Sequence, residues 1–121
     1  MILTTINQSR RLVLINYVDI VTAAEFERGY AELKVLLAEF PNGFRLLVDY
    51  CRLESMDMAG MDALGRTMEL LEQHGVELVV RVIPDPSKDI GIKIISIFHY
   101  KNAPRTVICE TMSQAAQALG W

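Results

Sequence analysis

The chain has 121 residues, of which 51% are hydrophobic and 22% are charged. This balance is typical of a globular protein and unlike that of a disordered segment. The length leaves no room for two independent cores, so we expect a single domain over residues 1–121. The formal net charge of −3 and the lack of a Lys/Arg cluster in the sequence argue against a nucleic-acid-binding protein.

The sequence also bears on cellular location. Its beginning lacks the basic region and the apolar run of a signal peptide, and no apolar stretch approaches the roughly 20 residues that a membrane-spanning helix needs. Cys51 and Cys109 fit neither a CxxC nor a zinc-binding pattern, so we expect buried, reduced thiols. These features predict a cytoplasmic protein without membrane insertion.

The first forty residues predict a hairpin followed by a helix. Two strand-like runs, 2–6 and 11–18, are separated by a polar turn, which is the pattern of a β-hairpin. Thr22 and Glu25 have the spacing of a capping box, and the helix that they begin is expected to end before Pro41. Apolar side chains recur at three- and four-residue intervals and predict one buried helical stripe: Phe26, Tyr30, Leu33, Leu37 and Phe40.

The middle of the chain predicts a strand, a helix and a further strand. The run 44–50 is almost continuously apolar, as expected for a strand covered on both faces. A helix is predicted over 58–74, because Gly75 suits the left-handed conformation that follows a helix, and an apolar strand is predicted over 76–83. The inward stripe of this helix is expected to contain Met61, Leu64, Met68 and Leu71.

The last third of the chain completes an alternating pattern. The segment 87–98 predicts a helix, although its isoleucines leave a strand open as the alternative. A short strand is predicted at 105–109, and Thr111 is expected to cap a final helix that ends near Leu119. Together these elements predict an α/β fold with a mixed, mostly parallel central sheet of about five strands, about four helices and an opening β-hairpin.

This order of elements resembles the STAS domain, the fold of bacterial anti-sigma factor antagonists and of the cytoplasmic tails of sulfate transporters. Leu46-Leu47-Val48-Asp49 is similar to the family's strand that ends in Asp or Asn. Asp57-Met58-Ala59-Gly60-Met61 stands where the family has Asp-Ser-Ser-Gly-Leu or Asp-Thr-Ala-Gly-Leu, and Gly75-Val76-Glu77-Leu78-Val79-Val80 resembles its Gly-x-x-Leu-x-Leu strand. The resemblance covers about residues 12–119.

One departure from the family bears directly on function. The position that the family phosphorylates corresponds to Met58, with Ala59 beside it, and neither side chain has a hydroxyl. A phosphoryl group would bring about −1.5 to −2 charges to an exposed helix start, and these side chains cannot accept one. Ser55 and Thr67 are the nearby hydroxyls, and we expect that neither occupies the position of the switch.

The partner-binding surface is therefore expected at the start and outer face of the 58–74 helix. Asp57 is either the N-cap of this helix, a partner contact, or both. Met58 is the better binding candidate among the nearby methionines, and Met61 is expected in the core. Gly60 and Gly65 indicate close packing against a neighbour. The full set of predicted partner-binding residues is Asp57, Met58, Ala59, Asp62 and Arg66.

No catalytic residues, metal ligands or cofactor-binding residues are predicted. The sequence has no Ser-His-Asp set, glycine-rich phosphate loop or closely spaced carboxylate pair. His74 is expected to interact favourably with the C-terminal end of its helix. Asp49 is expected to have a structural role at the end of its strand. These features predict a protein that is not an enzyme.

Three functional hypotheses follow. The resemblance implies a non-enzymatic regulatory module that binds an anti-sigma factor or a related kinase, and that acts as a permanently unphosphorylated antagonist or a scaffold. The second hypothesis is a STAS subunit that binds the ATPase of a lipid-transport ABC system. The third is a carrier of a small ligand, a lipid or a nucleotide, in a pocket between sheet and helices. Each hypothesis leaves open whether the chain forms a homodimer.

Overall fold

A five-stranded sheet forms the centre of the computed structural model, which describes residues 1–83 and 104–120. The strand order is β1-β2-β4-β6-β7. An antiparallel hairpin lies at one edge, and the pairings from β2 to β7 are all parallel. The strands are β1 (Ile2–Asn7), β2 (Leu12–Tyr17), β4 (Phe44–Asp49), β6 (Val76–Val82) and β7 (Arg105–Cys109). The predicted mixed, mostly parallel sheet with an opening hairpin is confirmed.

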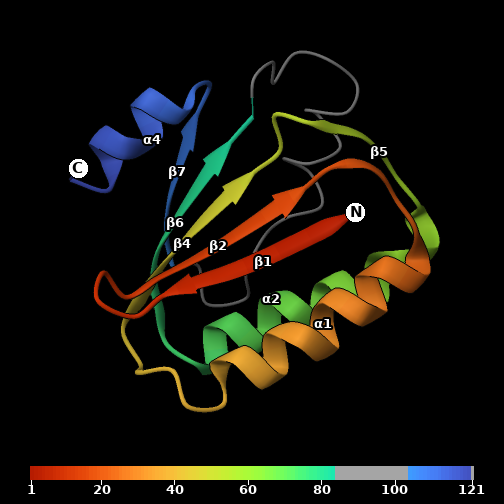
Figure 1. The fold of residues 1–121 in the computed structure, drawn as a ribbon, viewed down its shortest axis with the longest axis horizontal. Coiled ribbons are helices and arrows are strands. Elements are labelled where there is room, and N and C mark those ends of the chain that lie inside the picture. Colours follow the sequence, from red (N-terminus) through yellow and green to blue (C-terminus); the bar gives the residue numbers. More distant parts are fainter. Residues whose placement is uncertain (84–103, 121) are drawn as a thin grey trace.

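Helices cover both faces of this sheet (Figure 1). The helices α1 (Ala23–Leu37) and α2 (Met61–Gln73) lie side by side on one face, and α4 (Met112–Ala118) lies on the other. The core is accordingly divided in two: Leu46 and Val48 belong to the apolar cluster on the α1 and α2 side, whereas Leu47 belongs to the cluster under α4. Because neighbouring residues of a strand point to opposite faces, the run in β4 is buried on both faces, as predicted.

Local capping interactions position two of the helices as the sequence predicts. The Thr22 Oγ1 atom accepts a hydrogen bond from the Glu25 N–H at 3.2 Å, at the start of α1. The Thr111 Oγ1 atom accepts one from the Gln114 N–H at 3.1 Å, at the start of α4. Each cap satisfies an N–H group that has no partner inside the helix. After α2, Gly75 has a φ of +78°, the left-handed conformation that was expected there.

The apolar stripes follow the predictions with small differences. On α1, Phe26, Leu33 and Leu37 are buried and Tyr30 is half-buried, whereas Phe40 is buried just beyond the end of the helix. On α2, the predicted residues Leu64, Met68 and Leu71 are buried, and Met61 is half-buried against the same core. The stripe of α2 is wider than predicted, because three further residues are buried: Ala63, Thr67 and Leu70.

A second, small sheet was not predicted from the sequence. It consists of β3 (Asp19–Val21) and β5 (Leu53–Met56), which pair in parallel beside the main sheet. Asp19 has a φ of +57°, a conformation that Asp tolerates better than most residues, and this turn separates β3 from β2. The predicted 58–74 helix is also corrected, because residues Met58–Gly60 form a 3₁₀ turn before α2 begins.

The predictions for the segment 87–98, a helix or a strand, lie outside the described residues. The described part of the chain holds three α-helices where about four were predicted. None of the described helices has the length and apolar character needed to cross a membrane.

Candidate functional site

The candidate site is the 3₁₀ turn that leads from β5 into α2, which we call the α2 tip (residues 57–60). Asp57 has an extended backbone, and its Oδ1 atom accepts a hydrogen bond from the Ala59 N–H at 3.0 Å. The Gly60 N–H donates to the Asp57 carbonyl oxygen at 3.0 Å. Asp57 is therefore the N-cap of the tip, which confirms the structural role predicted for it.

Close packing against α1 fixes the end of the tip. Gly60 is buried, and a Cβ atom added there would lie 2.2 Å from the Cδ2 atom of Phe26. A side chain at this position would force the ring of Phe26 or the tip to move, so the packing favours glycine here. The prediction of close packing is confirmed at Gly60 and wrong at Gly65, where an added Cβ would have no atom within 4 Å.

The tip presents an apolar side chain to solvent. Met58 is 56% exposed, and Ala59 beside it is also exposed. The neighbouring methionines differ, because Met56 and Met61 are half-buried and pack against the core. Met58 is thus the methionine at this junction that points outward, and flexible thioethers of this kind suit adaptable binding surfaces.

The small sheet holds the tip from the other side. The Asp57 N–H donates to the Val21 carbonyl oxygen of β3 at 2.9 Å. Ile20, the preceding residue of β3, is 55% exposed and pairs with Ser55 of β5. Sequence reasoning missed Ile20, and the signal that could have found it is an isoleucine between a turn and a helix cap, next to the buried Val21.

The two remaining predicted residues differ in their surroundings. Asp62 is exposed in the first turn of α2. The Arg66 guanidinium forms an ion pair with Glu27 of α1, and it lies 5.0 Å from the ring centroid of Tyr30, within the range of a cation–π contact. The structure therefore places Asp62 with the tip, whereas Arg66 is engaged along the contact between α1 and α2.

The two hydroxyl residues considered from the sequence, Thr67 and Ser55, are both at least partly buried. Thr67 is buried, and its Oγ1 atom donates to the Ala63 carbonyl oxygen at 3.0 Å. Ser55 lies half-buried in β5.

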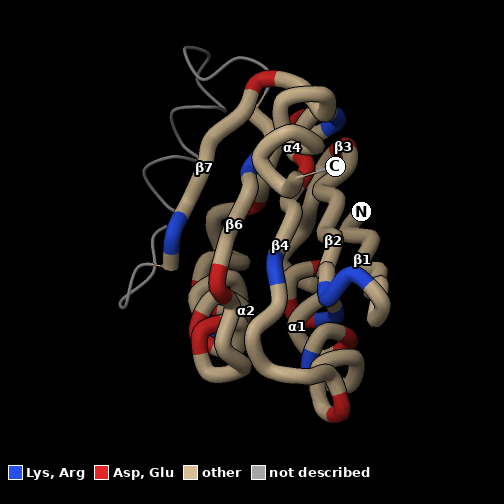
Figure 2. Tube along the Cα trace, turned by 90° about the vertical axis from the view of Figure 1, so that its left-hand side faces the viewer, with Lys and Arg blue, Asp and Glu red and all other residues tan. Residues whose placement is uncertain are grey.

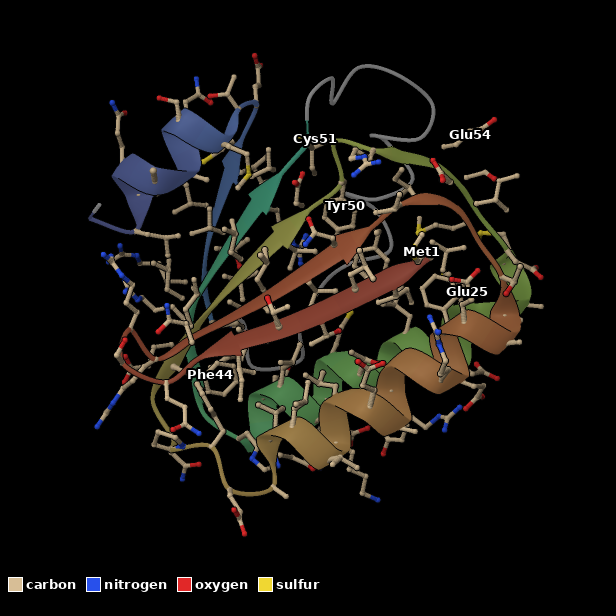
Figure 3. All side chains as sticks on the ribbon, in the orientation of Figure 1. Met1, Glu25, Phe44, Tyr50, Cys51 and Glu54 are labelled. Atoms are coloured by element: carbon tan, nitrogen blue, oxygen red, sulfur yellow. The ribbon has the colours of Figure 1, made fainter. Side chains whose placement is uncertain are left out.

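An ammonium group stabilises the segment that leads into α1. The Met1 ammonium donates to the carbonyl oxygens of Val18 at 2.7 Å and Ile20 at 3.2 Å. Its nitrogen also lies 2.8 Å from the Glu25 Oε2 atom, and Figure 3 shows the two side by side at the start of α1. The hydrogen bond from this ammonium holds the pKa of the Glu25 carboxyl below its ordinary value of 4.5.

The two cysteines differ in their exposure. Cys109 is buried as predicted, but Cys51 is exposed, because it lies in the turn after β4 rather than in the strand (Figure 3). Desolvation of the Cys51 thiol, with a contribution from the nearby Asp49 carboxylate, raises its pKa to about 11. The Asp49 Oδ1 atom also accepts a hydrogen bond from the Cys51 N–H at 2.9 Å. A thiol with this pKa is protonated at neutral pH and is a poor nucleophile.

Two small cavities lie between the sheet and the paired helices, one beside Gly29 and one beside Arg81, and each has a volume of about 10 Å³. This is about the space of one water molecule. Within residues 1–83 and 104–120, no group of three or more His, Cys, Asp or Glu side chains is placed to bind a metal ion.

Comparisons with known proteins identify the fold. No protein-family profile matches the sequence, and no curated protein matches it significantly. The anti-sigma factor antagonist SpoIIAA in its unphosphorylated form is similar with a TM-score of 0.66 at 16% identity, over 99% of this chain and 98% of that chain. The Bacillus cell fate determinant SpoIIAA in its phosphorylated form gives a TM-score of 0.64 at 16% identity, over 98% and 99%.

A third solved structure has the same fold. It is a DUF3478 protein with a SpoIIAA-like fold from Shewanella loihica PV-4, with a TM-score of 0.65 at 16% identity, over 98% of this chain and 92% of that chain. The chain thus has the SpoIIAA-like fold, which confirms the fold that the STAS resemblance implied.

Proposed function

We propose that this chain is a non-enzymatic regulatory module of the bacterial cytoplasm that binds a protein partner through the α2 tip. The partner class is an anti-sigma factor or a related kinase. The observation that supports this proposal is the exposure of Met58, an apolar side chain that is 56% accessible on a turn with a well-defined backbone. A flexible, polarisable thioether on such a support suits an adaptable protein-binding surface.

The comparison with SpoIIAA supports the choice of partner class. SpoIIAA is an anti-sigma factor antagonist, and its structure is known in unphosphorylated and phosphorylated forms. The STAS resemblance aligns Met58 with the residue that the family phosphorylates. Because Met58 and Ala59 have no hydroxyl, this chain would act as a permanently unphosphorylated antagonist or as a scaffold.

The proposal is tested by capture of the partner with variants of Met58. Met58→Asp places a carboxylate where the interface would be apolar, and burying an unpaired charge is costly. We expect at least about tenfold weaker capture, which corresponds to about 1.4 kcal/mol. Met58 is exposed at the beginning of the 3₁₀ turn, so the fold is expected to remain intact.

Val35→Asp is the matched control. Val35 is 76% exposed on α1, so the substitution adds the same charge to an apolar surface position away from the tip. The partner is first captured from lysate of the source organism, identified by mass spectrometry, purified and titrated with each variant. Equal binding of the two aspartate variants would contradict docking at the tip.

The identity of the partner separates the remaining hypotheses. Recovery of a kinase, together with one added phosphoryl group on Met58→Ser by intact-mass measurement, supports the anti-sigma system. Recovery of an ABC ATPase instead supports the second hypothesis, a subunit of a lipid-transport machine. Both outcomes use the same fold, so the fold itself does not separate them.

A further inference from the structure

We propose that the cleft between the beginning of the sheet and the end of α4, which we call the arginine cleft, binds a small organic phosphate. The cleft has a volume of about 400 Å³ and is lined by residues of β4, β6, β7 and the last turn of α4. The beginnings of β4, β6 and β7, whose residues line the cleft, lie at the opposite end of the sheet from the α2 tip (Figure 1). The proposal therefore does not depend on the partner-binding function.

The strand register brings two arginines to the same face of the sheet. Leu78 of β6 pairs with Arg45 of β4 on one side and with Arg105 of β7 on the other. Paired residues of parallel strands point to the same face, and neighbouring strands are about 4.8 Å apart. The backbones of Arg45 and Arg105 are thus separated by roughly 10 Å, with Leu78 between them. Figure 2 shows this basic character at the beginning of β4 and β7.

A β-bulge adds one acidic side chain to the cleft. Phe44 pairs with Val76, but the next residue, Arg45, pairs with Leu78. Glu77 is therefore the extra residue on β6, and a bulge changes the direction of the bulged side chain. This explains why Glu77 and Leu78, although adjacent in the strand, both line the cleft.

Neither arginine is neutralised by a carboxylate of the described residues. The guanidinium of Arg45 donates to the carbonyl oxygens of Leu119 and, at 3.3 Å, of Arg10. These bonds orient Arg45 without cancelling its charge. The ion pairs formed within residues 1–83 and 104–120 involve neither Arg45 nor Arg105. The described residues that line the cleft supply two guanidinium groups and one carboxylate, and thus a net positive charge, in a chain whose net charge is −3.

The dimensions and lining of the cleft indicate the ligand class. Its volume is in the range of small-molecule sites, about 300–1,000 Å³, and leaves room for an organic group beside a phosphate. Guanidinium groups match the geometry of phosphate oxygens and can bind them in a bidentate manner. Leu78 and Ala118 supply an apolar floor and wall for the organic group.

The test is an amide NMR titration of the full chain with phenyl phosphate as the probe. We expect saturable shifts at Leu78, Arg105 and Gly120. Arg105→Gln should weaken binding about tenfold, because a charge-assisted hydrogen bond to phosphate is lost. Arg105 is exposed, so this variant should fold. Glu77→Gln should strengthen binding several-fold, because it removes the repelling carboxylate.

Arg52→Gln is the matched control, since Arg52 is exposed in the turn after β4 and the variant loses the same charge. Its affinity should stay within about twofold of the unmodified chain, because charges beyond a Debye length are screened. Equal weakening by Arg105→Gln and Arg52→Gln would overturn the site, as would shifts that do not saturate. If Arg105→Gln does not fold, the sign of the Glu77→Gln effect decides, and weaker binding overturns the proposal.

Three further probes define which part of the ligand is recognised. Phenol should cause no saturable shift, and benzoate should bind more weakly than phenyl phosphate because it has a smaller negative charge. Inorganic phosphate should also bind more weakly, since it leaves the apolar floor uncovered. Equal affinity for inorganic phosphate and phenyl phosphate would overturn the organic part of the proposal, and stronger binding of benzoate would overturn the phosphate part.

Discussion

The beginnings of α1 and α2 are stabilised in different ways. At α1, Thr22 caps the N–H of Glu25, three residues further on, so the interaction is local in the sequence. At α2, the N-cap residue Gly60 makes no side-chain cap, and its position is fixed by contact with Phe26 of α1. The side-chain cap of α1 is therefore local in the chain, whereas the position of the N-cap residue of α2 depends on the tertiary structure.

This difference concerns function, because the α2 tip is the proposed binding surface. Its backbone is held by Asp57 within the turn, by Val21 of β3 and by the ring of Phe26. Changes in α1 should therefore alter a surface of α2 that is distant from them in sequence. The following predictions test how far the two starts differ, beginning with the largest expected effect.

Gly60→Ala should have the largest effect on stability. The added methyl group would lie 2.2 Å from a ring carbon of Phe26, so the ring or the tip must move. Overpacking of this kind typically costs about 1–3 kcal/mol, and we expect the upper part of that range in urea unfolding. We also expect weaker partner capture, because the tip that carries Met58 is displaced.

Gly65→Ala is the matched control on the same helix. An alanine there meets no atom within 4 Å, and replacing glycine in a helix interior typically stabilises by about 0.5–1 kcal/mol. Phe26→Leu should partly rescue Gly60→Ala, since it removes the ring. Equal free energies of unfolding for the two alanine variants would show that Gly60 is not constrained by Phe26.

The two caps should show the next largest effects. Thr22→Ala and Asp57→Ala should each lower the free energy of unfolding by about 1 kcal/mol, as each leaves an N–H without its side-chain acceptor. Thr22→Ser and Asp57→Asn keep the acceptor and should be close to the unmodified chain in stability.

The two cap residues should differ in their effect on partner capture, although their effects on stability are expected to be similar. We expect Asp57→Asn to weaken capture, since it removes a charge from the proposed interface, while Thr22→Ala leaves capture unchanged. Normal capture by Asp57→Asn would show that Asp57 acts as a cap alone.

The sequence was sufficient to predict features that depend on local patterns. The caps by Thr22 and Thr111, the left-handed Gly75 and the parallel order of the main strands are all confirmed. Each arises from residues close together in the chain or from a strong apolar periodicity. Asp57 belongs to the same group, because its cap closes within two residues.

Features that depend on distant contacts were missed. The strands β3 and β5 are too short to be recognised from the sequence. They are defined by their pairing with each other, across more than 30 residues of the chain. The exposed Gly65 has the same local pattern as Gly60, and the ring of Phe26 distinguishes them. The arginine cleft brings Arg45 and Arg105 together through the register of three strands, although the sequence has no cluster of basic residues.

The smallest expected effect is electrostatic and belongs to the start of α1. Glu25 forms an ion pair with the Met1 ammonium. The ion pairs within residues 1–83 and 104–120 include none from the α2 tip. Glu25→Gln should lower the free energy of unfolding at pH 7 by no more than about 0.5 kcal/mol, because the pair is partly exposed to solvent.

The pH dependence identifies the cause of that loss. The folded-state pKa of Glu25 lies below 4.5, so the charged form stabilises the fold above the unfolded-state pKa, and this contribution disappears as the pH falls through the folded-state value. In urea unfolding at several pH values, the unmodified chain and Glu25→Gln should therefore differ at neutral pH and converge as the pH falls through the folded-state pKa of Glu25. A difference that persists at low pH would mean that Glu25 contributes through packing, and the start of α1 would then resemble that of α2 more than the structure indicates.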